Sequence, residues 1–376
     1  MRLTGWDVSH RVGRPSIRFA AAVQICLVML VGCQQRETPP AEGPAALVAL
    51  VAYRSTHEVG LVQGTTVIAR SAGDYFDYPG SSLVTEDGHF VFARSAGQVA
   101  AIDAQTRRIT SVQVPGDARV GTGGGSTIVW WESPNRIMQL DLGRPTDGAT
   151  VRQAVELPRG PASPAPAEPV LIAARSGTVV LARVESAPSP FGGPDTLYAI
   201  RRNGSITRLG EVDANTPIGQ NSFSPGGDTF AYSRYRRSTN VCGQGGVTLV
   251  KLVDGSSRTV DLNRPAPGDG TGSQVSQMWW PADGPLTISY SSWNCSDLST
   301  VVPQSVWQLS GDQWTQTTRD RALQVLDVTP HERAIVVPEQ SDQPQTSGAL
   351  VVDADGQRTT IRPQVGAIAL IDRSAG

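Results

Sequence analysis

Histidines and cysteines are the side chains of this sequence that could hold a metal ion or act as nucleophiles, and they are few. The chain has four histidines, His10, His57, His89 and His331, and four cysteines. No His-Glu-x-x-His or Cys-x-x-Cys spacing occurs, although zinc sites need such closely spaced ligands. The sequence therefore predicts no metal site, and we expect His331, which follows Pro330, in an exposed turn.

Other catalytic signatures are also missing from the sequence. There is no Gly-x-Ser-x-Gly nucleophile elbow, and the glycine-rich run 121–125 lacks the lysine and the helix of a phosphate-binding loop. The acidic residues between Asp74 and Asp87 lack the glycine and the terminal glutamate of a calcium loop. The sequence predicts no catalytic residue and no cofactor. A catalytic pair of carboxylates on different strands remains an alternative, because the spacing of residues along the chain does not test it.

The N-terminal residues predict export. Four arginines precede the uncharged run Phe19–Gly32, which has 14 residues. A membrane-spanning helix needs about 20 apolar residues, so this run is too short to cross a bilayer. A basic region, a short apolar region and a small residue before the cut are typical of a secretory signal. We expect residues 1–32 to be a signal peptide.

The residues Leu30-Val31-Gly32-Cys33 resemble the lipobox of bacterial lipoproteins, whose cysteine receives a diacylglyceryl group before cleavage in front of it. The resemblance implies that Cys33 carries the lipid. Acyl chains such as palmitate contribute about 0.8 kcal/mol per buried methylene, and two chains hold a protein firmly on a membrane. We expect anchoring on the extracytoplasmic face of the cell membrane. Residues 33–46, rich in Pro, Glu and Ala, are typical of a flexible tether.

Two cysteines, Cys242 and Cys295, are left once the signal peptide and Cys33 are accounted for. An exported protein folds in an oxidising compartment, where an even remainder of cysteines favours a disulfide. We therefore predict a Cys242–Cys295 bond, which would stabilise the fold by on the order of 4 kcal/mol in the chain-entropy model.

The region 47–372 predicts an all-β domain. Short runs of Val, Ile, Leu, Thr and Tyr alternate there with turn residues, and no helical period extends over several turns. A strand-turn-strand pattern recurs at a spacing of roughly 40 to 50 residues, which is typical of β-propeller blades. Its clearest copy is Asn221–Arg234, and similar copies start at Ser82, Gln277 and Leu326.

These copies predict a β-propeller of about seven four-stranded blades, with six or eight as alternatives. One blade is expected from both ends of the domain, with three strands from Leu47–Arg70 and an inner strand from Ala367–Asp372 that closes the ring. The other blades are expected near 77–116, 118–158, 169–212, 216–263, 272–320 and 322–363.

The segment Phe223–Ser233 resembles the repeat signature of TolB-like and WD-type propellers, in which Phe-Ser-Pro-Asp-Gly precedes an apolar strand. Gly226 stands here where the signature has aspartate, and some copies lack the proline. The resemblance implies the propeller fold over most of the mature chain and does not specify a ligand.

Long loops and aromatic residues suggest a binding face. In a propeller the loops between the second and third strands lie on one face, and loops on a rigid scaffold often bind ligands. Four of these loops are long: 186–195, 235–246, 293–304 and 339–348. The predicted disulfide joins two of them. The residues around it have a composition favoured at interfaces, with packing on the disulfide as the alternative: Tyr235, Arg236, Arg237, Trp293 and Asn294.

Two tryptophan pairs, Trp130-Trp131 and Trp279-Trp280, lie in predicted strands. Successive side chains of a strand point to opposite faces, so one ring of each pair is expected in the core.

The charge of the chain argues against nucleic acid as a partner, because the formal net charge is −2 and no basic face is indicated. Our main hypothesis is a lipid-anchored propeller that acts as a non-enzymatic binding or scaffolding module for an envelope protein or glycan. The alternative is a propeller enzyme of the hydrolase or lyase class with its site at the channel mouth, because fold does not decide function. A sensor domain for an envelope ligand is a third possibility.

Overall fold

The computed structural model describes residues 49–75, 81–158, 168–184, 195–212, 218–237, 242–262, 270–339 and 345–371. The chain divides into two units, Met1–Ala46 and Leu47–Gly376. The predicted signal peptide, Cys33 and the tether all lie outside the described residues. In the described part, no helix has both the length and the apolar character needed to cross a membrane.

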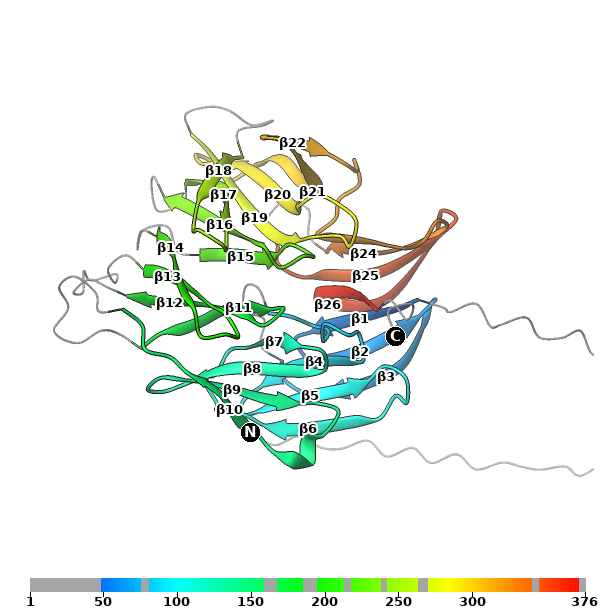
Figure 1. Ribbon diagram of the computed structural model, residues 1–376. Helices are drawn as coiled ribbons and strands as arrows, with labels where there is room; N and C mark the ends of the chain where they lie inside the picture. The colour runs from blue at the N-terminus through cyan, green and yellow to red at the C-terminus, as the bar shows by residue number, and fades with distance from the viewer. Residues whose placement is uncertain are drawn as a thin grey trace, which may run out of the picture. The chain divides into compact units, whose positions relative to one another are not determined.

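The described residues of the second unit confirm the all-β prediction. Four sheets each contain four antiparallel strands that follow one another in sequence (Figure 1). The first comprises β7 (Val120–Gly124), β8 (Thr127–Glu132), β9 (Arg136–Asp141) and β10 (Thr150–Ala154), with a short 3-10 helix at Pro145–Asp147. The second comprises β11 (Val170–Arg175), β12 (Thr178–Val184), β13 (Asp195–Ile200) and β14 (Ile206–Val212).

The next two sheets have the same order of strands. One comprises β15 (Ile218–Phe223), β16 (Thr229–Arg237), β17 (Gly243–Lys251) and β18 (Ser257–Asp261). The other comprises β19 (Thr271–Trp279), β20 (Thr287–Asn294), β21 (Thr300–Ser310) and β22 (Gln313–Gln316). A three-stranded sheet comprises β4 (Phe90–Ser95), β5 (Gln98–Asp103) and β6 (Ile109–Gln113), and an isolated bridge joins Val84 to Val91 of β4.

A seven-stranded sheet contains both the first and the last strands of the domain. Its order is β23-β24-β25-β26-β1-β2-β3. The strands are β23 (Gln324–Thr329), β24 (Glu332–Pro338), β25 (Gly348–Ala354), β26 (Gln357–Ile371), β1 (Leu50–Ser55), β2 (Glu58–Gln63) and β3 (Thr66–Ala72). In Figure 1, β26 lies between β25 and β1. Its first part pairs with β25 and its second part with β1, with Leu50 opposite Ile371. One long strand therefore connects the two ends of the domain.

The turn in the clearest sequence repeat explains why this pattern recurs. β15 and β16 are joined by a tight turn, in which Gly227 N donates to Ser224 O at 2.9 Å. Ser224 Oγ also donates to Asp228 Oδ1 at 2.6 Å and accepts from Thr229 N at 3.0 Å. A short hydroxyl residue followed by proline and glycine thus provides both the backbone conformation and the hydrogen bonds of the reversal.

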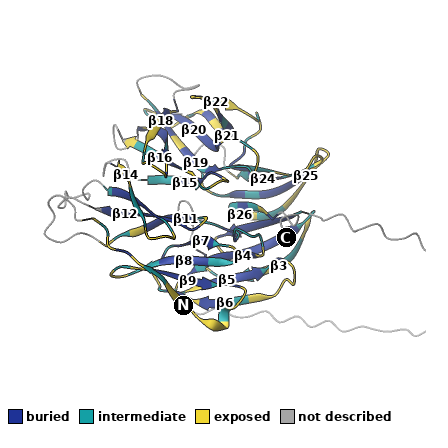
Figure 2. Ribbon diagram, in the orientation of Figure 1, coloured by how far each residue is buried: buried dark blue, intermediate teal, exposed yellow. Residues whose placement is uncertain are grey.

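Apolar clusters lie between neighbouring sheets and form the core (Figure 2). Trp130 belongs to the cluster shared by the β4–β6 and β7–β10 sheets. Its neighbour Trp131 packs against a different cluster, which contains Val129 and Leu181. The two rings therefore lie on opposite sides of their sheet, as strand alternation predicts. This arrangement places Trp131 next to β11–β14, where the pocket described below is found.

Candidate functional site

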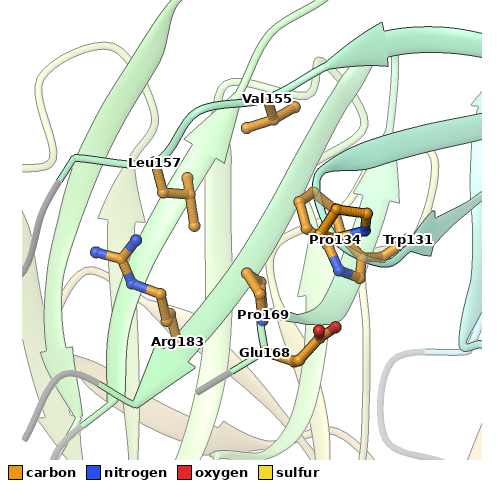
Figure 3. A pocket seen from close by; sticks show the side chains of 7 residues that line it. All are labelled: Trp131, Pro134, Val155, Leu157, Glu168, Pro169 and Arg183. Atoms are coloured by element: carbon orange, nitrogen blue, oxygen red, sulfur yellow. The ribbon is translucent and has the colours of Figure 1, made fainter. Parts of the chain in front are cut away.

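A pocket of about 250 Å³ lies between the β7–β10 and β11–β14 sheets (Figure 3). Its walls come from the end of β8, the turn between β8 and β9, the segment that joins β10 to β11, and the end of β12. The lining residues are Trp131, Pro134, Val155, Leu157, Glu168, Pro169 and Arg183. An apolar lining with a few polar groups is typical of small-molecule sites.

Glu168 is the acidic group of this pocket. It lies just before β11, and its carboxylate points toward Trp131 and Pro134 (Figure 3). Ser133 Oγ donates a hydrogen bond to Glu168 Oε1 at 2.6 Å, so the carboxylate is held against the β8–β9 turn. Within the described residues no hydrogen bond reaches the other oxygen, Oε2. That oxygen can accept a proton or a hydrogen bond from a ligand.

Arg183 is the basic group, on the side of the pocket opposite Glu168 (Figure 3). It is only 5% exposed. Its Nη2 donates to the hydroxyl of Tyr198 at 3.2 Å and also to the carbonyl of Pro158, and the guanidinium lies 5.3 Å from the centre of the Tyr198 ring. These contacts fix a positive charge at the end of β12, where it lines the pocket.

Among the described residues near the pocket, two hydrogen-bonding groups have no partner. Trp131 Nε1 is buried without a hydrogen bond. Thr196, which lies directly opposite Arg183 across β12 and β13, is 1% exposed and its Oγ1 also lacks a partner. Buried polar groups normally have partners, so unpaired groups near a pocket are consistent with a polar ligand.

Asp195 is a further titratable group of this sheet, and burial raises its pKa. It neighbours Thr196 in β13, and side chains alternate along a strand. The carboxyl of Asp195 is therefore directed to the other side of the sheet from Thr196 and Arg183. It is not a second acidic group of the pocket.

The histidines of the described region lie apart from the pocket. Each pairs through Nδ1 with an aspartate, His57 with Asp74 at 3.2 Å and His331 with Asp355 at 3.1 Å. His89 lies 3.5 Å from Asp87 in the same way. All three imidazoles are well exposed. Across the described ranges, no three His, Cys, Asp or Glu residues are placed to hold a metal ion together.

Tyr235 and Trp293, two of the residues that the sequence suggested as a binding face, pack on their own sheets. A Cβ atom on Gly243 would lie 2.5 Å from Tyr235 Cζ, and one on Gly272 would lie 2.5 Å from Trp293 Cε2, so each ring covers a glycine. Arg236 is exposed, and the side chain of Arg237 lies outside the described residues. Asn294 Oδ1 accepts from Ser296 N at 2.8 Å. A ligand for this face remains a prediction.

The predicted disulfide is present: Cys242 and Cys295 are bonded, with their Cα atoms 5.3 Å apart. It joins the segment before β17 to the turn between β20 and β21, and therefore links two neighbouring sheets. Of the four long loops predicted here, only 293–304 lies wholly within the described residues.

No protein-family model matches the sequence, and no curated protein matches it significantly. Among solved structures, an oligogalacturonate lyase in complex with manganese is similar, with a TM-score of 0.50 and 13% identity over 84% of this chain and 84% of that chain. An oligogalacturonate lyase from Vibrio parahaemolyticus gives 0.46 and 11% over 84% and 79%. A mutant puromycin hydrolase gives 0.40 and 14% over 76% and 53%.

The first of these structures shares the fold of this chain. The chain has an all-β fold of the propeller type. The main sequence hypothesis, a non-enzymatic binding or scaffolding module, is contradicted, because the structure that shares this fold is an enzyme. The sequence hypothesis was wrong because it inferred function from missing motifs, whereas groups from separate segments can form a site without any motif.

Manganese is held by clustered oxygen or imidazole ligands, and the described residues provide no such cluster. The sequence also gave no signal for the pocket, because Glu168 and Arg183 belong to no motif and Ser133 is 35 residues from Glu168 in the chain.

Proposed function

We propose that this chain is a propeller enzyme of the lyase class that cleaves an acidic oligosaccharide in the pocket between the β7–β10 and β11–β14 sheets. The observation that carries the proposal is the arrangement of Glu168 and Arg183 on opposite walls of the pocket. A lyase that acts beside a carboxylate needs one base and one positive charge, and the pocket provides one of each. The similarity to an oligogalacturonate lyase supports the substrate class.

In the proposed reaction Glu168 removes the proton from the carbon next to the carboxylate of a uronate. The electron pair of that C–H bond forms a carbon–carbon double bond as the bond to the leaving oxygen breaks. The proton then passes from Glu168 to the leaving oxygen, so that atoms and charge balance. Arg183 stabilises the negative charge that develops on the substrate carboxylate, an effect that is strong for a preorganised charge away from water.

The pocket favours a lyase over the hydrolase half of the alternative. Glycoside hydrolases usually need two carboxylates about 5 to 9.5 Å apart, and the described residues that line this pocket include one. A nucleophilic serine needs a base such as histidine within hydrogen-bond reach, and the lining residues that the structure describes include no histidine. Trp131 adds an aromatic wall on which a sugar ring can pack.

The test is an assay of the full chain with oligogalacturonate, with its methyl ester, and with a neutral glucan of equal length. A lyase creates a conjugated double bond, so we expect an increase in ultraviolet absorbance with the acidic substrate alone. The variant Glu168→Gln should lower kcat by at least about 100-fold, the range of general acid–base catalysis. Glu156→Gln is the matched control, because Glu156 is exposed on the same segment and does not line the pocket.

Activity that survives Glu168→Gln would contradict this assignment of the site. A panel of acidic oligosaccharides could also release reducing ends without forming any double bond. That result would contradict the lyase assignment and indicate a hydrolase.

We propose further that the six sheets form a ring of about seven blades. The seven-stranded sheet supports this number, because it can be divided within β26 into two four-stranded blades that share that strand. The second part of β26, β1, β2 and β3 would then form the blade that closes the ring. The same proposal includes that the blades are of the TolB-like type, which the segment Phe223–Ser233 resembles.

The proposed enzyme acts at the extracytoplasmic face of the cell membrane, held there by a lipid on Cys33. The lipobox-like residues and the disulfide between Cys242 and Cys295 support export. Metabolic labelling with palmitate should mark the wild-type chain, and Cys33→Ala should abolish the label and release the protein from membranes. Labelling of the variant would contradict the proposal. An envelope glycan would be the partner, with the predicted face around Tyr235 and Trp293 as a further contact region.

A further inference from the structure

The carboxylate of Glu168 is bonded to a residue of a different sheet. Glu168 lies just before β11, where the chain enters the β11–β14 sheet, whereas Ser133 lies in the turn between β8 and β9. The two residues are 35 positions apart in the chain, and Ser133 Oγ donates to Glu168 Oε1 at 2.6 Å. Pro134, which follows Ser133, lines the pocket together with Glu168 (Figure 3). The hydrogen bond therefore connects two sheets at the wall of the pocket.

The turn that carries Ser133 is itself fastened. Arg136 Nη2 forms an ion pair with Glu132 Oε2 at 2.7 Å across the turn, and the same two residues lie opposite each other in the pairing of β8 with β9. Val155 N donates to Asn135 O at 2.8 Å, which ties the turn to the segment after β10. The hydroxyl of Ser133 therefore starts from a backbone that is held on both sides.

This hydrogen bond makes the two carboxylate oxygens of Glu168 unequal. Among the described residues, one side-chain donor reaches the carboxylate, and it reaches Oε1 alone. A hydrogen bond to an ionised carboxylate stabilises its charge, and the bond is directional, so it also restricts rotation of the carboxylate group. The charge on Oε1 is partly satisfied by Ser133, which leaves Oε2 as the more basic oxygen in a fixed direction.

We propose that Ser133 is a positioning residue for the lyase reaction, and that its hydroxyl holds Glu168 so that Oε2 is the atom that removes the proton. This inference rests on the proposed function, because it assigns a further residue to the same reaction. Ser133 is not among the described residues that line the pocket, so it acts through Glu168. Alignment of a base with the C–H bond that it breaks is a large part of catalysis, and small misplacements are costly.

The first test compares the kinetics of full chains on oligogalacturonate. Ser133→Ala removes the donor and should lower kcat by about tenfold or more, the range of one hydrogen bond to a charged group. KM should change little, because Glu168 loses a partner and the substrate does not. Ser133→Thr keeps a hydroxyl and should recover most of kcat. Ser256→Ala is the matched control, because Ser256 is an exposed turn serine of another sheet.

The second test needs no catalysis. In the carbon-13 spectrum of a chain labelled on its glutamate carboxyl carbons, Glu168→Gln identifies the Glu168 signal by its loss. At pH 7 this signal should shift in Ser133→Ala and return toward its wild-type position in Ser133→Thr. Both Ser133 and Glu168 are exposed, so the melting temperature of Ser133→Ala should equal that of the wild type.

The two tests separate failure of this inference from failure of the proposed function. An unshifted Glu168 signal, or a wild-type kcat for Ser133→Ala while Glu168→Gln is inactive, would overturn the role of Ser133 and leave the lyase assignment intact. A low kcat that Ser133→Thr does not restore would also overturn it. A wild-type chain that is inactive on every acidic oligosaccharide would overturn the lyase assignment and the role of Ser133 with it.

Discussion

The side chain of Gln324 forms two hydrogen bonds with the backbone of Ile368. Gln324 Nε2 donates to Ile368 O at 2.8 Å, and Ile368 N donates to Gln324 Oε1 at 3.0 Å. Gln324 begins β23, and Ile368 lies in the part of β26 that pairs with β1. The side-chain amide of Gln324 thus takes the place of a backbone hydrogen-bonding partner and links two strands that are not neighbours in the sheet. Gln324 is 7% exposed.

Replacement of Gln324 by leucine should destabilise the domain. It leaves a buried N–H and a buried C=O of Ile368 unpaired, which costs about 2 to 4 kcal/mol in total. Urea unfolding of Gln324→Leu, with the exposed Gln313→Leu as control, measures this loss. Equal midpoints for the two variants would mean that the bonds contribute nothing.

Glu58 should make the stability of the domain depend on pH. Burial raises its pKa, but the hydrogen bond from Tyr53 at 2.6 Å and the charge and hydrogen bond of Arg362 at 2.7 Å outweigh burial, so the pKa lies below the ordinary value of 4.5. A carboxyl with a lowered pKa in the folded state stabilises above its unfolded pKa, and this contribution disappears as the pH falls through the folded pKa.

The wild type should therefore exceed Glu58→Gln in melting temperature at pH 7, and the difference should shrink as the pH is lowered below about 4.5. Thermal unfolding of both chains from pH 7 to pH 3 tests this. A difference that stays constant over the range would show that Glu58 acts without its charge.

Loss of the disulfide should weaken the domain. The bond closes a loop with a sequence separation of 53 residues, for which the chain-entropy model gives about 4 kcal/mol. The double variant Cys242→Ser with Cys295→Ser should unfold at lower denaturant than the wild type. A reductant should lower the midpoint of the wild type and leave that of the variant unchanged. A wild type that is insensitive to reductant would contradict the prediction.

Gly60 should not tolerate a side chain. A Cβ atom there would lie 2.6 Å from the hydroxyl of Tyr53, which is fully buried and bonded to Glu58. Gly60→Ala must displace the ring, and overpacking of this kind costs about 1 to 3 kcal/mol. Gly116→Ala is the control, because no atom lies within 4 Å of its Cβ position. Denaturant unfolding compares the two, and equal stability would show that the ring moves freely.

Two buried serines of β20 should respond differently to replacement by alanine. Ser289 and Ser291 are both almost fully buried. Ser289 Oγ donates to Ala322 O at 3.2 Å, whereas Ser291 Oγ has no partner within the described part of the chain. Removal of an unpaired hydroxyl avoids its desolvation cost, so Ser291→Ala should be neutral or slightly stabilising. Ser289→Ala should lose about 1 kcal/mol or more. Equal losses in urea unfolding would indicate that Ser291 has a hydrogen bond in solution.

The all-β class and the propeller-type fold could be predicted from the sequence because they depend on local and periodic signals. Alternation of apolar residues marks a strand wherever it occurs, and turn residues such as Ser224, Pro225 and Gly227 carry their own hydrogen bonds and conformations. The disulfide could be predicted because Cys242 and Cys295 were the remaining cysteines. The pairing of Ala367 and its neighbours with β1 followed from counting strands in the repeats.

The candidate site was decided only by the tertiary structure. Glu168 and Arg183 come from different segments, with no motif to connect them. Whether such side chains meet depends on which way each strand faces and on how neighbouring sheets pack. Strand alternation places Arg183 on the pocket side of its sheet and directs Asp195 to the other side of the same sheet. A sequence pattern specifies that two faces exist, and only the packing of the sheets decides which face meets which neighbour.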